Sequence, residues 1–95
     1  MTIDDLTALI KKKGFRDTFH ILTSSKDYKC EKHAFYDELN QFSYYNSFFR
    51  IKDELLKREL IEIEINDSKK HIKLTEKGID VYHKLMEIND IINEN

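Results

Sequence analysis

The sequence contains no proline, no tryptophan, only two glycines and a single cysteine. Without proline, no helix has to break at a residue that lacks a backbone donor. Because Cys30 stands alone, no internal disulfide can form, and this cysteine usage fits a reducing compartment. Apolar residues make up 40% of the chain and charged residues 36%, which is the composition of a folding sequence. We expect a single, mainly helical domain over residues 1–95, since so short a chain holds only one core.

Long apolar runs and targeting signals are also absent. No stretch is long and apolar enough to span a bilayer. Residues 1–5 are acidic and lack the basic and then apolar pattern of a secretory signal. We therefore expect a cytoplasmic protein without a membrane segment.

The sequence also lacks the motifs that mark common catalytic and metal sites. It has no glycine-rich phosphate loop, no nucleophile motif and no pair of histidines at the helical spacing of a zinc site. Cys30 and His33 have the spacing of half a metal site, but the other three histidines fall in other predicted elements. We expect no enzymatic activity, no metal and no cofactor.

The first 40 residues show the apolar spacing of helices. Three helices are predicted in this part of the chain, over residues 3–13, 15–22 and 32–40. Gly14 is either a stop or a kink between the first two. Alternating apolar and charged residues predict a short strand at residues 28–31.

A further helix is predicted directly after a tight connection at residues 41–43. Ser43 is a suitable cap, and the helix runs to about Glu59 with one apolar face, made by Phe48, Ile51, Leu55 and Leu56. Two helices joined by so short a turn indicate a helix-turn-helix.

The next segment has the pattern of a hairpin. Residues 60–65 alternate isoleucine with glutamate, residues 66–69 favour a turn, and residues 70–74 alternate again. Thr75 can cap the last helix. Within this helix, an apolar stripe repeats at spacings of four, three and four residues, at Val81, Leu85, Ile88 and Ile92.

Two segments, LLKRELI at residues 55–61 and LTEKG at residues 74–78, resemble winged-helix regulators of the MarR and PadR kind. In that family the recognition helix ends in a leucine-rich turn followed by Gly-Leu-Ile, and Leu-Thr-x-x-Gly opens the helix after the wing. Glu59 stands where the family usually has glycine. The resemblance covers roughly residues 15–85 and implies both the fold and DNA binding.

The fold class expected from these patterns is mainly α with a small antiparallel β-hairpin (α+β). More specifically, we expect a winged helix-turn-helix with an additional long C-terminal helix. The core would span about residues 15–78, and residues 79–95 would form a dimerisation helix.

In a winged helix, the predicted recognition helix would enter the major groove of double-stranded DNA. Opposite its apolar face lie Asn46, Arg50, Asp53 and Lys57. Asn46 can pair with adenine and Arg50 with guanine, so these two are the expected base readers. Without that context, the same residues would form an ordinary solvated face. The candidate DNA-binding residues of this helix are Tyr44, Tyr45, Asn46, Ser47, Arg50 and Lys57.

Other lysines are candidates for phosphate contacts, which require only placed positive charge. Lys69 and Lys70 lie at the tip of the predicted wing. Lys26, Lys29 and Lys32, before and at the start of the preceding helix, are weaker candidates. The alternative for Lys69 and Lys70 is a charged hairpin end that only keeps the protein soluble.

The formal net charge of −2 is not the strong positive charge typical of a nucleic-acid binder. The final helix explains much of this, because Asp80, Glu87, Asp90 and Glu94 outnumber Lys84 there. This helix should face away from DNA. Its stripe, Val81, Leu85, Ile88 and Ile92, is expected to form a homodimer interface, because paired half-sites need a two-fold protein; the alternative is packing on its own domain alone.

The expected function is that of a dimeric protein that binds double-stranded DNA and acts as a sequence-specific transcriptional regulator. One alternative is an adaptor that coats a DNA site in plasmid partition. Another, of a different class, is a winged-helix protein-interaction module that does not bind DNA. The aromatic residues Tyr44, Tyr45, Phe48 and Phe49 allow base stacking on single strands as well, although core packing is favoured.

Overall fold

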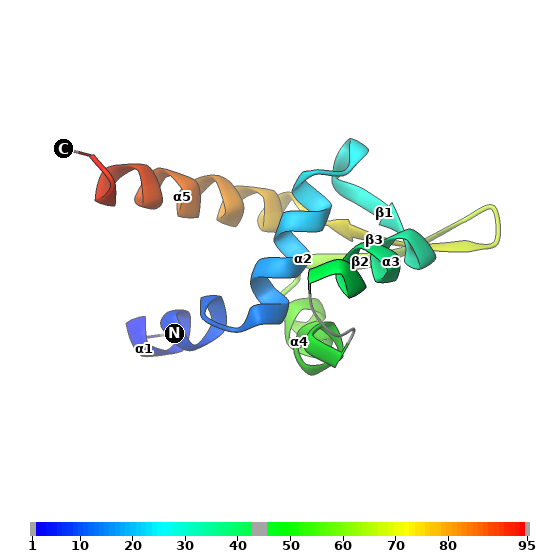
Figure 1. Ribbon diagram of the computed structural model, residues 1–95, viewed down its shortest axis with the longest axis horizontal. Helices are drawn as coiled ribbons and strands as arrows, with labels where there is room; N and C mark the ends of the chain where they lie inside the picture. Colours follow the sequence, from blue (N-terminus) through cyan, green and yellow to red (C-terminus); the bar gives the residue numbers. More distant parts are fainter. Residues whose placement is uncertain (1, 43–45, 95) are drawn as a thin grey trace.

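The computed structural model describes residues 2–42 and 46–94. The described elements, drawn in Figure 1, are the helices α1 (Ile3–Ile10), α2 (Lys13–Thr23), α3 (Lys32–Phe42), α4 (Asn46–Lys57) and α5 (Glu76–Ile92), the short 3-10 helix η1 (Lys26–Tyr28), and the strands β1 (Lys29–Glu31), β2 (Ile61–Asn66) and β3 (Lys69–Leu74). The expectation of a mainly helical α+β fold with a small antiparallel sheet is confirmed. The sheet has three strands rather than two, because the short strand predicted at residues 28–31 joins the hairpin.

Local sequence explains where two of the helices, α1 and α5, begin. The Thr2 hydroxyl accepts a hydrogen bond from the Asp5 backbone amide, and the Asp5 carboxylate accepts one from the Thr2 amide, which together form a capping box. At α5, the Thr75 hydroxyl accepts a hydrogen bond from the Gly78 amide at 2.9 Å. The predicted cap at Thr75 is therefore confirmed.

The boundary between the first two helices differs from the prediction. The helix expected over residues 3–13 ends at Ile10, and α2 begins at Lys13. Gly14 is neither a stop nor a kink, because it lies inside the first turn of α2 and is buried there. The chain turns two residues before Gly14, at Lys12, whose backbone is extended. The packing of α2 against α4, rather than the local turn, explains the glycine at position 14.

The boundaries around residues 41–45 were also predicted only in part. Residues 41 and 42, expected in the connection, continue α3, which ends at Phe42. The described part of the next helix runs over Asn46–Lys57, two residues short of the predicted end at Glu59. The predicted cap, Ser43, and the candidates Tyr44 and Tyr45 lie outside the described residues.

The three strands pair in the order β1-β3-β2, and all pairs are antiparallel. In the hairpin, Ile61 pairs with Leu74 and Asn66 with Lys69, so a two-residue turn at Asp67 and Ser68 connects the strands. These two residues have φ angles of 52° and 66°. Positive φ at both positions is the geometry of the tight turn that matches the twist of a hairpin.

One core joins the helices to the sheet. Its buried apolar side chains come from α1, α2, α3 and α4, from β2 and β3 and from Leu60, and η1, β1 and α5 add partly buried ones. The innermost residues, almost without exposure, are Leu22, Phe35, Leu39, Phe48, Ile51, Leu55, Ile61 and Leu74. The apolar face predicted for α4 is thus confirmed for Phe48, Ile51 and Leu55, which are fully buried.

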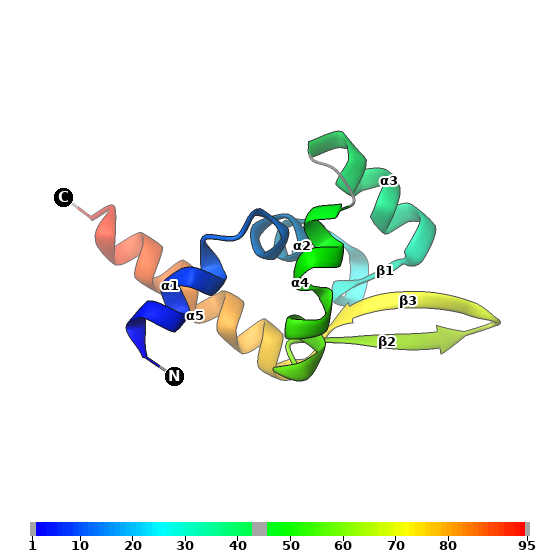
Figure 2. The same cartoon turned by 90° about the horizontal axis from the view of Figure 1, so that it is seen from below.

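Two helices extend beyond this core. Figures 1 and 2 show α1 and α5 leaving the body at the same end, opposite to the hairpin, so that the molecule measures 47 × 26 × 24 Å. Val81 and Leu85 of α5 are half-buried against the core, whereas Ile88 and Ile92 are exposed. Among the described residues, no helix combines the length and the apolar character that a membrane crossing requires.

Candidate nucleic-acid interface

The outward face of α4 carries the residues that the helical spacing predicted. Asn46, Arg50, Asp53 and Lys57 are exposed, on the side opposite to the buried Phe48, Ile51 and Leu55. Ser47 is half-buried, because the first turn of α4 lies against α2. The helix therefore offers one amide and two cationic side chains to a partner, with a single carboxylate among them.

Close packing against α2 sets the position of α4. A β-carbon added to Gly14 would overlap the backbone carbonyl oxygen of Ser47 and approach the Ile51 side chain to 2.8 Å. Since real β-carbons do not come so close to other atoms, only glycine permits this approach. The first turns of α2 and α4 can consequently touch through their backbones.

Aromatic side chains pack α4 against α3. The Phe48 ring packs edge-on against Phe35, with centroids 4.7 Å apart, and against Tyr36 at 6.0 Å. The half-exposed Phe49 ring stacks on Tyr36 at 5.8 Å. Phe48 is therefore part of the core, and Phe49 makes a flanking contact with α3.

Backbone hydrogen bonds of the two residues Glu59 and Leu60 close the end of α4. The amide of Leu60 bonds to the Leu55 carbonyl at 2.9 Å, and the amide of Glu59 bonds to the Leu56 carbonyl at 3.0 Å, which is a Schellman-type ending. Glu59 has a φ angle of 60°, in the left-handed region that glycine favours. The residue that departs from the winged-helix pattern thus adopts a glycine-type backbone.

The two segments that resemble winged-helix regulators are in direct contact. The Thr75 amide bonds to the Leu60 carbonyl at 3.1 Å, and the Lys77 ammonium bonds to the Arg58 carbonyl at 2.8 Å. A β-carbon at Gly78 would overlap the Leu60 carbonyl oxygen. The threonine and the glycine of LTEKG are therefore explained by the close approach of α5 to the end of α4.

Three lysines from three different elements surround one small cavity. Lys32 begins α3, Lys52 lies on α4, and Lys70 lies on β3. The cavity between them has a volume of about 110 Å³ and is otherwise lined by Tyr36, Phe48, Ile63 and Ile72. The other lining residues are aromatic or aliphatic, so the three lysines are the charged residues of the cavity.

None of these three lysines forms an ion pair within the described residues. Two lysines on the strands β1 and β3, by contrast, are paired with carboxylates. Lys29 pairs with Glu64 at 3.8 Å, and Lys73 pairs with both Glu62 and Glu64 at the same distance. These pairs lie on the opposite face of the sheet, because strand neighbours alternate between faces. One sheet face is thus neutralised, and the cavity side keeps its positive charge.

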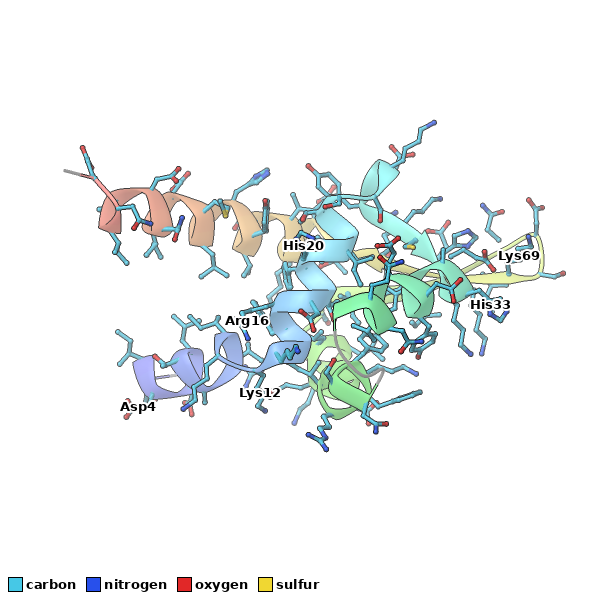
Figure 3. All side chains as sticks on the ribbon, viewed as in Figure 1. Asp4, Lys12, Arg16, His20, His33 and Lys69 are labelled. Atoms are coloured by element: carbon cyan, nitrogen blue, oxygen red, sulfur yellow. The ribbon has the colours of Figure 1, made fainter. Side chains whose placement is uncertain are left out.

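The lysines that the sequence suggested for phosphate contacts therefore fall into two groups, those that line the cavity and those that do not. Lys32 and Lys70 line the cavity, whereas Lys29 is paired on the other face, and Lys26 lies in η1 and does not line the cavity. Figure 3 shows Lys69 at the far end of the hairpin, and its side chain is exposed. Sequence reasoning missed Lys52. Its position beside the outward face of α4 was readable, but its approach to the hairpin depends on the tertiary fold.

Two further features concern metal-binding side chains and the single thiol. The described residues contain no group of three or more side chains suited to hold a metal ion. Burial is the main cause that raises the pKa of the Cys30 thiol, so this thiol is a weaker nucleophile at neutral pH than an exposed one.

Comparisons of the chain with the profiles of known protein families, with curated proteins and with solved structures find no match. The geometry of α4, the hairpin and the three cavity lysines is therefore what indicates a function.

Proposed function

We propose that this protein is a winged helix-turn-helix protein that binds double-stranded DNA as a homodimer and regulates transcription at specific sequences. In this proposal, α3 and α4 form the helix-turn-helix, and the hairpin of β2 and β3 forms the wing. The single observation that carries it is the convergence of Lys32, Lys52 and Lys70 on one cavity beside the outward face of α4.

The three lysines support an anionic partner for an electrostatic reason. Like charges that share a cavity repel one another, and no carboxylate within the described residues pairs with them. A DNA backbone supplies phosphates at close, regular spacing, and each lysine that neutralises one releases a counterion. The cavity lies between the helix and the wing, so phosphate contacts there would orient α4 toward a groove.

Base recognition is assigned to α4. A major groove admits one helix, and side chains near the helix start commonly reach the base edges. Asn46 and Arg50 are exposed in the first two turns of α4 and have the amide and guanidinium groups that pair with adenine and guanine. Asp53 follows on the same face of α4. Its carboxylate would be repelled by a DNA phosphate, which would disfavour deeper insertion of α4 into the groove.

The test measures binding to a duplex of 20–30 base pairs by fluorescence anisotropy over a range of salt concentrations. For the unmodified protein, we expect the logarithm of the binding constant to fall linearly with the logarithm of salt concentration. For the variant with Lys32→Gln, Lys52→Gln and Lys70→Gln, we expect that slope to be smaller by about 2 to 3, at roughly 0.9 per lost contact.

A matched control removes the same charge from lysines that already have partners. The variant with Lys12→Gln, Lys29→Gln and Lys73→Gln breaks ion pairs with Glu54, Glu62 and Glu64. We expect it to keep most of the salt slope. Equal loss in both variants would mean that only net charge matters, and no salt-dependent binding by the unmodified protein would refute the proposal.

A further inference from the structure

The turn between α1 and α2 carries a run of positive charge. Lys11, Lys12 and Lys13 follow one another there, and all three are exposed. Arg16, in the first turns of α2, is exposed as well, and residues 6–16 contain no carboxylate. None of these residues belongs to α4 or to the hairpin, so the turn is a separate basic surface.

Two contacts hold this turn against α4. The backbone at Gly14 touches the backbone carbonyl oxygen of Ser47, where a β-carbon would not fit. The Lys12 ammonium pairs with the Glu54 carboxylate at 3.5 Å. Ser47 and Glu54 are seven residues apart, which is about two helical turns, so both contacts lie on the same side of α4.

The lysine cavity lies on the other side of α4. Successive residues of a helix are about 100° apart around its axis, so Glu54 and Lys52 are about 160° apart. Lys52 lines the cavity together with Lys70 of the hairpin. The exposed Asn46 and Arg50 fall on the outward side, between these two positions. Figures 1 and 2 show the same arrangement, with α1 on one side of α4 and the hairpin on the other.

The acidic residues around the turn do not cancel its charge. Glu54 is engaged by Lys12, and Asp17 lies about one turn further along α2 and is half-buried. The four cations of residues 11–16 exceed these two carboxylates. The acidic first turn of α1 lies at the far end of that helix, about 10 Å away along its axis.

We propose that Lys11 and Lys13 form a second phosphate-binding surface, which contacts the DNA backbone across the major groove from the backbone that the cavity lysines contact. This inference rests on the proposed function and adds the second strand to it. A major groove is about 12 Å wide and has a phosphate backbone on each side. A helix with its side chains is about 10 to 12 Å across, so cations on both sides of α4 meet both backbones.

Lys12 has a different role from its two neighbours. Its pair with Glu54 holds the turn against α4 and neutralises a carboxylate that would otherwise repel a phosphate on this side. Lys11 and Lys13 flank it in the sequence, with α-carbons about 3.8 Å from that of Lys12. Their charges are therefore placed beside α4 by the same contacts.

The salt dependence of duplex binding tests the surface. For the variant with Lys11→Gln and Lys13→Gln, we expect the slope to be smaller than that of the unmodified protein by about 1 to 2, at roughly 0.9 per lost contact. The matched control, Lys26→Gln with Lys84→Gln, removes the same charge from exposed positions in η1 and α5. We expect the control to keep nearly the whole slope.

A second measurement identifies the backbone that each surface contacts. In a duplex with a selected site, phosphates are replaced one at a time by uncharged methylphosphonates. The unmodified protein should lose affinity at phosphates on both sides of the groove. The variant with Lys11→Gln and Lys13→Gln should become insensitive on one side only, and the triple variant of the cavity lysines on the other, because a contact that has lost one partner no longer responds to loss of the second.

The outcomes separate this inference from the proposed function. If the unmodified protein binds DNA with a clear salt slope and the variant with Lys11→Gln and Lys13→Gln keeps that slope, this inference is overturned and the proposed function stands. Equal loss in the control, or insensitivity of both lysine variants to the same phosphates, would overturn it too. No salt-dependent binding by the unmodified protein would refute both.

A single substitution keeps the test decisive if the double variant does not fold. Lys11 follows the last residue of α1 and is exposed, so Lys11→Gln leaves the buried contacts of α2 unchanged. We expect this variant to lose about 0.9 of the salt slope. A slope equal to that of the unmodified protein would remove Lys11 from the interface and overturn the proposal.

Discussion

The backbone carbonyl oxygen of Ser47, in the first turn of α4, lies directly against the α-carbon of Gly14, in the first turn of α2. The contact explains a glycine inside a helix, where it would otherwise cost about 1 kcal/mol relative to alanine. It also connects the N-terminal helices to the position of the helix that carries Asn46 and Arg50. A change at residue 14 should therefore affect both stability and DNA binding.

We expect Gly14→Ala to lower the free energy of unfolding by about 1 to 3 kcal/mol, because the added methyl group overlaps backbone that cannot move aside. Urea denaturation followed by circular dichroism measures the change. Lys13→Ala, at the exposed neighbouring position, serves as the control and should change stability by less than about 0.5 kcal/mol. A neutral or stabilising Gly14→Ala would mean that α2 and α4 pack less closely.

Replacing Glu59 with glycine should stabilise the protein. Glu59 has a φ angle of 60°, and a residue with a β-carbon pays about 1 kcal/mol to adopt the left-handed region. The same change at Lys57, the last residue of α4, should destabilise by up to about 1 kcal/mol, because glycine is a poor helix former and Lys57 has a helical backbone. Opposite signs for the two substitutions in thermal or urea unfolding are the expected result, and equal signs would contradict the turn geometry.

Thr18 is fully buried, and its hydroxyl has no hydrogen-bond partner within the described residues. We expect Thr18→Val to leave stability unchanged or to raise it by about 1 kcal/mol, since an unsatisfied buried hydroxyl is replaced by a methyl group. For comparison, the Thr23 hydroxyl donates to the Phe19 carbonyl at 2.6 Å, so Thr23→Val should lower stability. A clear loss in Thr18→Val would show that the hydroxyl has a partner, such as a buried water.

In α4, Arg50→Ala should weaken binding to a selected DNA site by about 1 to 3 kcal/mol and relax the base preference at one position. The reason is the loss of a guanidinium that pairs with guanine in the major groove. Selection of bound sequences from a random library, with and without the substitution, measures both effects. Unchanged affinity and preference would show that this face of α4 does not read bases.

The two hairpin lysines should differ in effect. Lys70 lines the cavity with Lys32 and Lys52, whereas Lys69 pairs with Asn66 across the hairpin and lies at its end. We expect Lys70→Gln to reduce the salt slope of DNA binding by about 0.9 and Lys69→Gln to reduce it by less. The reverse order would place the phosphate contact at the tip of the hairpin.

Features that depend on neighbours in the sequence were predicted well. The outward face of α4, the cap at Thr75 and the hairpin between residues 60 and 74 follow from repeats of 3.6 and 2 residues and from turn and capping chemistry. These signals act over a few residues, so they are complete in the sequence. The stripe of α5 was predicted in the same way, but the sequence did not show that Val81 and Leu85 pack inward while Ile88 and Ile92 remain exposed.

Local periodicity in the amino-acid sequence was sufficient to predict the kinds of elements, their order and the polar side of α4. The tertiary structure alone decided that Gly14 sits inside α2, that Lys52 joins Lys32 and Lys70 at one cavity, and that Lys29 is neutralised on the opposite face. Each of these depends on the approach of segments distant in the chain. Such an approach is set by the packing of the whole core, which no local repeat encodes.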